Sequence, residues 1–158
     1  MSNPEYFVTD FLKIINVIKK NKVCRIAIND APSPYIVPVN FGYGIHGNQW
    51  TFWFHGARTG NKMKLIRKNP HVTIEIDGDH QLIKAEEACD HSYAYSSIIA
   101  RGTAKIVQDA KEIKQGMDRI MQQVTAESGF HYREDMMKAV CVVRVDCTTL
   151  TCRQHLTD

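Results

Sequence analysis

The segment from Trp50 to Ile76, WTFWFHGARTGNKMKLIRKNPHVTIEI, holds the residues whose types and spacing are best suited to chemistry. It predicts an aromatic strand that ends at His55, then a glycine-containing turn, then a short basic helix that stops at Asn69-Pro70. This arrangement directs a helix N-terminus, the side chain of Lys62 and that of His55 to one place beside a strand end. Free backbone N–H groups and the helix dipole both favour an anion there. The segment therefore predicts a site for a phosphate-bearing ligand.

The turn itself has the residue types that such a site needs. Its two glycines permit a close backbone approach and unusual φ values. Thr59 is a suitable N-cap, which would leave the N–H groups near Gly60, Asn61 and Lys62 free. Lys62 falls in the first helical turn, where the dipole disfavours a cation unless an anion lies nearby. His55 is interpreted in two ways, as a ligand contact or as a histidine satisfied by a backbone carbonyl.

The side chains around this turn have simpler interpretations. Lys64, Arg67 and Lys68 are expected to form a solvated helix face. Alternation along the aromatic strand predicts that one of its faces is core and that Trp53 faces the other way with His55, where it would line a cleft or pack. The core-facing residues are Trp50, Phe52 and Phe54.

The whole chain is expected to form one domain, residues 1–158, long enough to bury a core. Hydrophobic residues make up 44% of it and charged residues 23%, an ordinary globular composition. The net charge of +3 is too small, and the Lys and Arg residues too scattered, to favour nucleic acid. No apolar run approaches the ~20 residues that cross a bilayer, and no leader precedes the first helix. These features predict a cytoplasmic protein without a membrane partner.

The five cysteines form an odd set without a CxxC pair, so a disulfide framework is not expected. Cys141, Cys147, Cys152 and His155 suggest a metal site at first sight. However, Cys141 and Cys147 are separated by ~20 Å of extended chain, whereas zinc ligands must converge on one point. Buried or surface thiols are therefore the preferred interpretation, and no metal is expected.

Hydrophobic periodicity and turn residues outline the elements that must position these groups. Pro38 predicts a sheet edge or a bulge in its strand, Gly102 predicts a bend, and Asp109 with Glu112 resembles a capping box. Short strands dominate and only one helix is long, which favours an antiparallel barrel with peripheral helices. The predicted strands are 23–28, 35–43, 50–55, 71–76, 95–107, 139–146 and 150–153, and the predicted helices are 11–20, 109–124 and the short one that ends at Asn69.

Four segments in this order and spacing resemble a known family. They are YIVPVNFGY (Tyr35–Tyr43), FHGARTGNKMKLIRKNPHV (Phe54–Val72), EACDHSYAYSSIIARG (Glu87–Gly102) and the closing VVRVDCTTLT. They look like the FMN-binding split-barrel group related to pyridoxamine 5'-phosphate oxidase, and most like its nitroimidazole-resistance (Nim) proteins. The resemblance covers nearly the whole chain and is loosest before Lys22 and over 125–138. It implies a mainly β fold, an antiparallel Greek-key split β-barrel.

The same resemblance implies a homodimer with two FMN molecules in the clefts between subunits. His55, Ala57 and the turn Gly60-Asn61-Lys62 would surround the FMN phosphate, with Lys62 as its charge partner. A run of three residues would pass beside the isoalloxazine ring, and a polar pair would supply a contact from the fifth strand. The run is Val39, Asn40 and Phe41, and the pair is Ser96 and Ser97.

Some positions depart from the family pattern. Asn61 replaces an arginine that is common in the oxidases, and Cys152-Arg153 stands where relatives often have Gly-Lys. Cys89 matches a cysteine often seen in the Nim-like group, although a buried thiol or a loop contact is the simpler interpretation. The oxidase's own substrate-binding tail is not recognisable, which argues against oxidation of pyridoxine phosphate.

Two functions of different class follow. The first is an FMN-dependent oxidoreductase, nitroreductase-like, that reduces small electron-poor organic molecules such as 5-nitroimidazoles, with NAD(P)H as electron donor. No side chain need act as acid or base for a hydride to leave reduced flavin, so His55 is only a candidate for a polar group near the reacting ring. The second is a flavin- or haem-binding module without turnover of its own.

Overall fold

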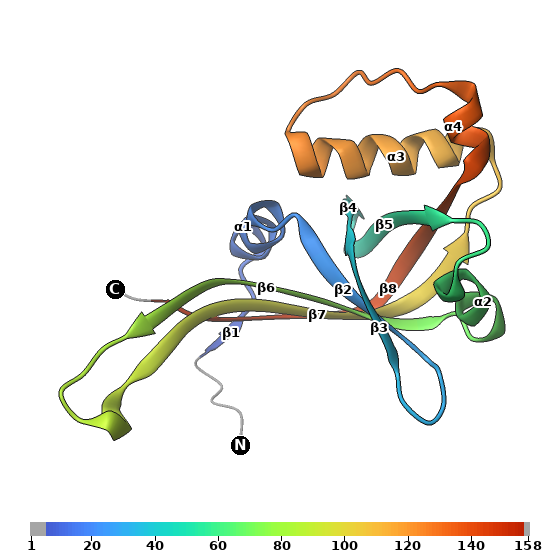
Figure 1. The fold of residues 1–158 in the computed structure, drawn as a ribbon. Helices are drawn as coiled ribbons and strands as arrows, with labels where there is room; N and C mark the ends of the chain where they lie inside the picture. The colour runs from blue at the N-terminus through green and yellow to red at the C-terminus, as the bar shows by residue number, and fades with distance from the viewer. Residues whose placement is uncertain (1–5, 157–158) are drawn as a thin grey trace.

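The computed structural model of the chain describes residues 6–156, which form a curled antiparallel sheet with helices around it (Figure 1). The helices are α1 (Phe11–Lys20), α2 (Asn61–Lys68), α3 (Ala110–Thr125) and α4 (Glu134–Ala139), and a 3₁₀ turn, η2, spans Ala88–Asp90. The strands are β1 (Phe7–Val8), β2 (Val23–Ile28), β3 (Tyr35–Asn40), β4 (Gly42–His46), β5 (Gln49–Ala57), β6 (His71–Ile83), β7 (Ser92–Ile106) and β8 (Val140–His155). The prediction of a mainly antiparallel β fold with peripheral helices is confirmed.

The two edges of the sheet are adjacent in the sequence. The hydrogen-bonded order is β3-β2-β6-β7-β8-β5-β4, with β1 paired to β8. β3 and β4 are thus the two ends of the path, although Phe41 alone separates them along the chain. The sheet must therefore curl until its edges approach each other, and β3 contacts β5 across the gap. Because the path does not close, the sheet is open rather than a fully closed barrel.

The single strand predicted for Tyr35–Tyr43 is wrong, because the chain changes sheet edge inside it. β3 ends at Asn40 and β4 begins at Gly42. A β-carbon on Gly42 would lie 2.3 Å from the carbonyl carbon of Arg119, so α3 packs directly on this corner. Pro38 lies in β3, at the sheet edge that its missing N–H predicts.

Four other strands, β5 to β8, are longer than predicted. β6 continues to Ile83 and β7 begins at Ser92, so the two form a hairpin that extends beyond the sheet. The two strands predicted at the end of the chain are one strand, β8, whose register shifts opposite Arg101 and Gly102. A β-carbon on Gly102 would lie 2.4 Å from the carbonyl oxygen of Asp146, which confirms that this glycine permits the predicted bend.

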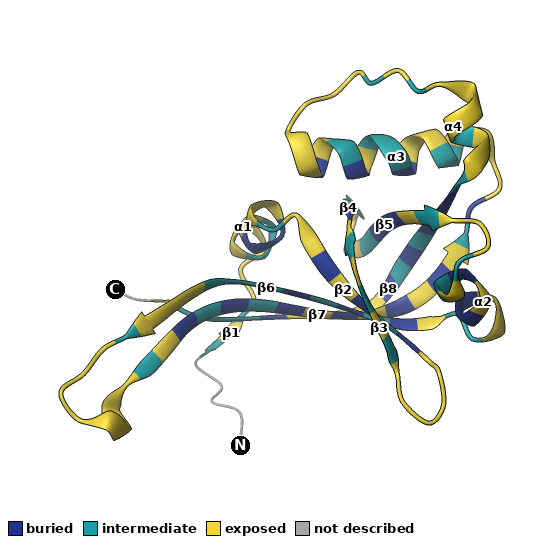
Figure 2. Cartoon of the chain, in the orientation of Figure 1, coloured by how far each residue is buried: buried dark blue, intermediate teal, exposed yellow. Residues whose placement is uncertain are grey.

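The main core lies between the inner face of the sheet and helices α1 and α2 (Figure 2). Helix α1 supplies Val17 and Ile18, and α2 supplies Met63, Leu65 and Ile66. From β5, Phe52 and Phe54 are buried as predicted, while Trp50 is half-buried and packs against the same cluster.

Trp53 belongs to a second apolar cluster instead of lining a cleft. It is 6% exposed and packs with Val107, Ile120 and Val142 beneath α3. Of the two interpretations of Trp53, the structure supports packing, because α3 covers that part of the outer face of β5. Asp109 begins α3 as predicted and accepts hydrogen bonds from the N–H groups of Lys111 (3.0 Å) and Glu112 (2.9 Å).

Four of the five cysteines are buried, and Cys89 is exposed on η2. Burial raises the pKa of Cys24 and of Cys147 to about 12 and that of Cys152 to about 11, so these groups stay thiols at neutral pH. Within residues 6–156, no cluster of three or more His, Cys, Asp and Glu side chains could hold a metal ion. No helix in this part of the chain is long and apolar enough to cross a membrane.

Gly116→Ala is expected to destabilise the fold, although the same change in an exposed helix stabilises by roughly 1 kcal/mol. The added methyl would lie 2.7 Å from Cγ1 of Val142 and 2.8 Å from Cδ1 of Trp53, both held in the core. We expect the free energy of unfolding, measured with denaturant, to fall by about 1–3 kcal/mol. Gln115→Ala on the exposed side of α3 is the control, and a gain in stability of Gly116→Ala would contradict this packing.

Candidate functional site

Helix α2 presents free backbone N–H groups at the end of β5. It begins at Asn61 and is preceded by Gly60 as N-cap, so the prediction of Thr59 as N-cap is wrong. The N–H of Gly60 donates to the carbonyl of Ala57 (3.2 Å), and the N–H of Met63 donates to the carbonyl of Gly60 (3.0 Å). Within the described residues, the N–H groups of Asn61 and Lys62 have no acceptor, and the first turn holds no acidic residue. The positive end of α2 is thus uncompensated.

Lys62 turns from this helix end back onto β5. A β-carbon on Gly56 would lie 2.3 Å from Cε and 2.7 Å from Nζ of Lys62, so the lysine occupies the space that the glycine leaves. Gly56 is therefore what allows the ammonium group to lie against the strand between His55 and Ala57. Lys62 makes no ion pair with any residue of 6–156.

His55 precedes Gly56 on β5, and the Lys62 ammonium group affects it electrostatically. It is on β5 opposite Val142, and its side chain is exposed. Partial desolvation and then the nearby Lys62 ammonium lower the pKa of His55 below its ordinary value. Lys62 is the smaller of the two causes of the lowered pKa, so its ammonium group lies within electrostatic range of the imidazole. The helix N-terminus and Lys62 thus lie together at the end of β5, whereas the convergence of His55 on the same point stays a prediction.

The segment from Val39 to Phe41 approaches the same strand end. Gly42 of β4 pairs with Trp53 of β5, two residues before His55. Because the two strands are antiparallel, the residues before Gly42 lie toward His55, where β3 contacts β5. Phe41 is buried against Phe52, with ring centroids 5.9 Å apart. The side chain of Asn40 donates to the carbonyl of Lys22 (2.9 Å). Phe41 can thus offer a ligand only its backbone groups.

Ser96 and Ser97 do not join this group within one chain. Ser96 pairs with Gly78 and Gln154, toward the far end of β7. His55 lies near the opposite end of β7. It pairs with Val142 of β8, and the carbonyl of Val142 accepts a hydrogen bond from the N–H of Val107, which follows β7 (2.9 Å). Roughly 35–40 Å of strand separates Ser96 from Val107. The side chain of Ser96 is wholly buried.

Arg58 takes part in the site region, which the sequence patterns did not indicate. Its Nε donates to the carbonyl of Lys138 (2.7 Å), in the last turn of α4. This bond holds the loop after β5 against a helix that is distant in sequence. A cation at a helix C-terminus is also favoured by the dipole. No local signal could reveal it, since the acceptor is a backbone carbonyl that any residue carries.

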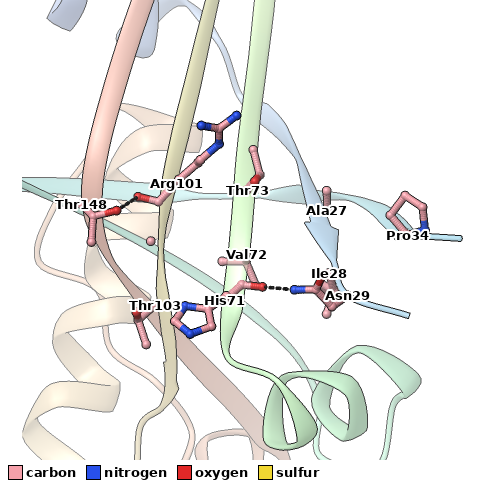
Figure 3. A pocket seen from close by; sticks show the side chains of 11 residues that line it. Ala27, Ile28, Asn29, Pro34, His71, Val72, Thr73, Arg101, Thr103 and Thr148 are labelled. Atoms are coloured by element: carbon pink, nitrogen blue, oxygen red, sulfur yellow. Dashed lines mark hydrogen bonds between the residues drawn. The ribbon is translucent and has the colours of Figure 1, made fainter. Parts of the chain in front are cut away.

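A cavity of about 510 Å³ lies elsewhere, on the outer face of β2, β6, β7 and β8 (Figure 3). Asn29, His71 and Arg101 are among its polar lining residues, and neither His55 nor Lys62 lines it. Asn29 donates to the carbonyl of His71 (2.9 Å), and Thr148 donates to that of Arg101 (3.1 Å). The same face exposes Ile36 and Ile99 nearby. The outer face is therefore a hollowed, partly apolar surface separate from the cluster at α2.

The donor set at α2 suits a phosphate group. Two free N–H groups and one ammonium group lie at the start of α2, this ammonium group contributes to the lowered pKa of His55, and the first turn of α2 brings no carboxylate that would compete for an anion. Charge-assisted hydrogen bonds to a phosphate are stronger than hydrogen bonds between neutral groups. Glycine at position 56 leaves the space that the Lys62 side chain occupies.

Comparison with solved structures identifies similar folds. A candidate 5-nitroimidazole antibiotic resistance protein from Bacteroides thetaiotaomicron is 27% identical, with a TM-score of 0.81 over 94% of this chain and 86% of that one. A flavocytochrome from Azotobacter vinelandii is 12% identical, with a TM-score of 0.77 over 97% and 71%. An FAD- and haem-binding protein from Mycobacterium smegmatis is 15% identical, with a TM-score of 0.75 over 97% and 76%. The latter two likenesses show the fold alone.

Comparison with curated protein sequences gives no match. The family model for pyridoxamine 5'-phosphate oxidase matches residues 12–154, which is nearly the whole chain. The resemblance in the sequence, the open antiparallel sheet and the phosphate-suited end of α2 agree with this match. The chain belongs to the pyridoxamine 5'-phosphate oxidase family.

Proposed function

We propose that this protein is an FMN-dependent oxidoreductase that reduces small electron-poor organic molecules, 5-nitroimidazoles among them, with NAD(P)H as electron donor. The observation that carries the proposal is the position of Lys62, which lies against Gly56 at the uncompensated N-terminus of α2. That arrangement suits the phosphate of a flavin nucleotide. A flavin supplies the hydride chemistry when bound.

The comparisons support the cofactor and the substrate class to different degrees. Flavin binding is named for the relatives from Azotobacter and Mycobacterium, and the second of these is described as binding FAD. FMN rather than FAD is proposed because the site offers one compact cluster of donors for one phosphate. The relation to nitroimidazoles comes from the 27% identical protein of Bacteroides.

Different residues of the chain would bind different parts of the cofactor. Lys62 and the N–H groups of Asn61 and Lys62 would bind the phosphate, with His55, Ala57 and Gly60 around it. The backbone of Asn40 and Phe41, with Val39, would lie beside the ring system. His55 is the candidate polar group near the reacting ring or the substrate.

The proposal includes a homodimer with the cofactor between subunits. The cluster at α2 lies on an exposed strand end of one chain, so a second copy would be needed to enclose a ligand there. Ser96 and Ser97 are distant from His55 in the same chain. In the dimer they would contact only the cofactor that is bound at α2 of the other subunit. The hollowed outer face of β2, β6, β7 and β8, which exposes Ile36 and Ile99, is one surface open to pairing. A cytoplasmic location stays a prediction of the sequence.

A flavin- or haem-binding module without turnover is the second candidate, favoured by the haem named for the protein from Mycobacterium. Spectroscopy separates the two. The purified protein, incubated with FMN and freed of excess, should show flavin absorbance that bleaches with NAD(P)H without oxygen and recovers with a 5-nitroimidazole. Bound flavin that never bleaches would favour the module, as would a Soret band after haem addition. Failure to bind FMN or FAD would contradict both flavin proposals.

Lys62→Ala is expected to weaken FMN binding by roughly 1.5–3 kcal/mol, the scale for losing a hydrogen bond to a charged group. Titration followed by flavin fluorescence measures the affinity, and circular dichroism checks the fold. Lys111→Ala is the matched control, because Lys111 is likewise the second residue of a helix and is exposed. Equal affinities of the two variants would show that the phosphate does not bind at α2.

The same substitution should raise the pKa of His55 in the protein without FMN. Lys62 disfavours the imidazolium, so its removal lets His55 take up a proton at higher pH, although partial desolvation, the larger cause, still holds the pKa below its ordinary value. An NMR titration of the imidazole carbon signals measures this change. Lys111→Ala should leave the titration as it is, and an unchanged pKa in Lys62→Ala would contradict the proximity of the two side chains.

A further inference from the structure

The hairpin formed by residues 81–94, called the arm below, projects from the rest of the chain at the end of β6 and β7 (Figure 1). Along it, β6 and β7 pair only with each other within the described chain. A two-stranded hairpin by itself is at best marginally stable in water. Even so, Leu82 and Tyr93, which lie directly opposite each other, are 49% and 53% exposed. The arm therefore carries apolar side chains that its own chain leaves largely uncovered.

The tip of the arm is acidic. Glu86, Glu87 and Asp90 are exposed around η2, and none of them forms an ion pair with residues 6–156. Lys84 is the one lysine or arginine between Gln81 and Tyr93, so the carboxylates outnumber it. Elsewhere in the structure acidic side chains are commonly paired, as Asp79 is with Lys20 at 3.0 Å. The tip is thus a negative surface without a cationic partner of its own.

Helix α2 has the opposite character. Lys64, Arg67 and Lys68 are exposed, the helix NKMKLIRK contains no acidic residue, and none of these three forms an ion pair in the described part of the chain. Lys64 and Lys68 are four residues apart on one face, where like charges repel. Lys62 is not part of this surface, because it turns toward Gly56. The exposed face of α2 is thus a positive surface without an anionic partner.

The two surfaces lie on opposite sides of the molecule, with η2 at the end of the arm and α2 beyond the other end of the sheet (Figure 1). They cannot meet within one chain. In a twofold symmetric dimer, by contrast, each contact forms twice, because a surface of one copy meets the complementary surface of the other. Complementary charge on two such surfaces favours this pairing and opposes others.

We propose that the arm of one chain docks on α2 of a second copy, with Glu86, Glu87 and Asp90 against Lys64, Arg67 and Lys68. This inference rests on the homodimer included in the proposed function. Helix α2 is only about 12 Å long, so an arm on its exposed face lies close to its N-terminus. Each copy then helps to enclose the phosphate site of the other, and Leu82 and Tyr93 are covered by the partner.

Cross-linking tests the contact directly. Cys89 at the arm tip is exposed and the other four cysteines are buried, so Lys68→Cys creates one new reactive thiol. A short bismaleimide should join Cys89 to Cys at position 68 of a second chain and give a covalent dimer on a denaturing gel. Wild type shows any link between two Cys89 residues, and Lys68→Cys/Cys89→Ser shows any link between two cysteines at position 68. Both can therefore be distinguished from the expected product. Gln115→Cys on exposed α3 is the matched control and should give no dimer.

Charge exchange gives a second measurement. Reversal of the helix face (Lys64→Glu, Arg67→Glu, Lys68→Glu) should raise the dimer dissociation constant, measured by sedimentation at low salt, about tenfold. Reversal of the tip (Glu86→Lys, Glu87→Lys, Asp90→Lys) should do the same, and the combined variant should recover most of the loss.

The outcomes distinguish this inference from the proposed function. A protein that binds FMN and sediments as a dimer, yet gives no cross-link and no effect of charge reversal, overturns the arm contact and leaves the proposed function standing. A monomer that binds FMN overturns both the homodimer and the arm contact. Equal cross-linking in the Gln115→Cys control also overturns the contact, because the reaction would then not depend on position.

Discussion

The covalent connection between opposite edges of the sheet is the constraint on which the rest of the structure depends. β3 and β4 are separated by Phe41 alone, yet they end a path of strands that runs through β2, β6, β7, β8 and β5. An antiparallel sheet can satisfy this only by curling. The curl encloses the core under α1 and α2, and it brings the end of β3 to β5, where His55 lies. The open seam of the sheet and the candidate site are therefore consequences of one connection.

Electrostatics then distinguishes the two ends of the molecule. Near α2, Lys62 and the helix N-terminus concentrate positive charge, and Lys62 adds to the desolvation that lowers the pKa of His55. A folded chain tolerates such a concentration at modest cost on an exposed surface, because solvent screens it. An anionic ligand would neutralise this positive charge, and the attraction would contribute to the free energy of binding. The acidic arm at the far end carries the opposite imbalance, so one chain contains two complementary surfaces that it cannot bring together.

The sequence predicted the local elements well where a short pattern decides them. α1 and β2 have the bounds that periodicity indicated, Pro38 lies on an edge strand, and Gly102 permits a bend. The errors fall where a distant element decides. Residues 35–43 alternate like one strand, but the packing of α3 on Gly42 divides it. The sequence left open whether Trp53 lines a cleft or packs, which the position of α3 decides, and the extent of the arm depends on pairing between strands rather than on residue type.

For the site, the sequence by itself determined the chemistry: a glycine turn, a lysine and a histidine before a helix that lacks acidic residues. These are short-range features, because backbone N–H groups, helix polarity and glycine freedom act within a few residues. Only the tertiary structure decided which groups share a place. It placed Lys62 over Gly56, brought β3 to β5, joined Arg58 to α4, and separated Ser96 and Ser97 from His55. Such proximities depend on sheet register and curvature, which long-range packing sets and no local pattern encodes.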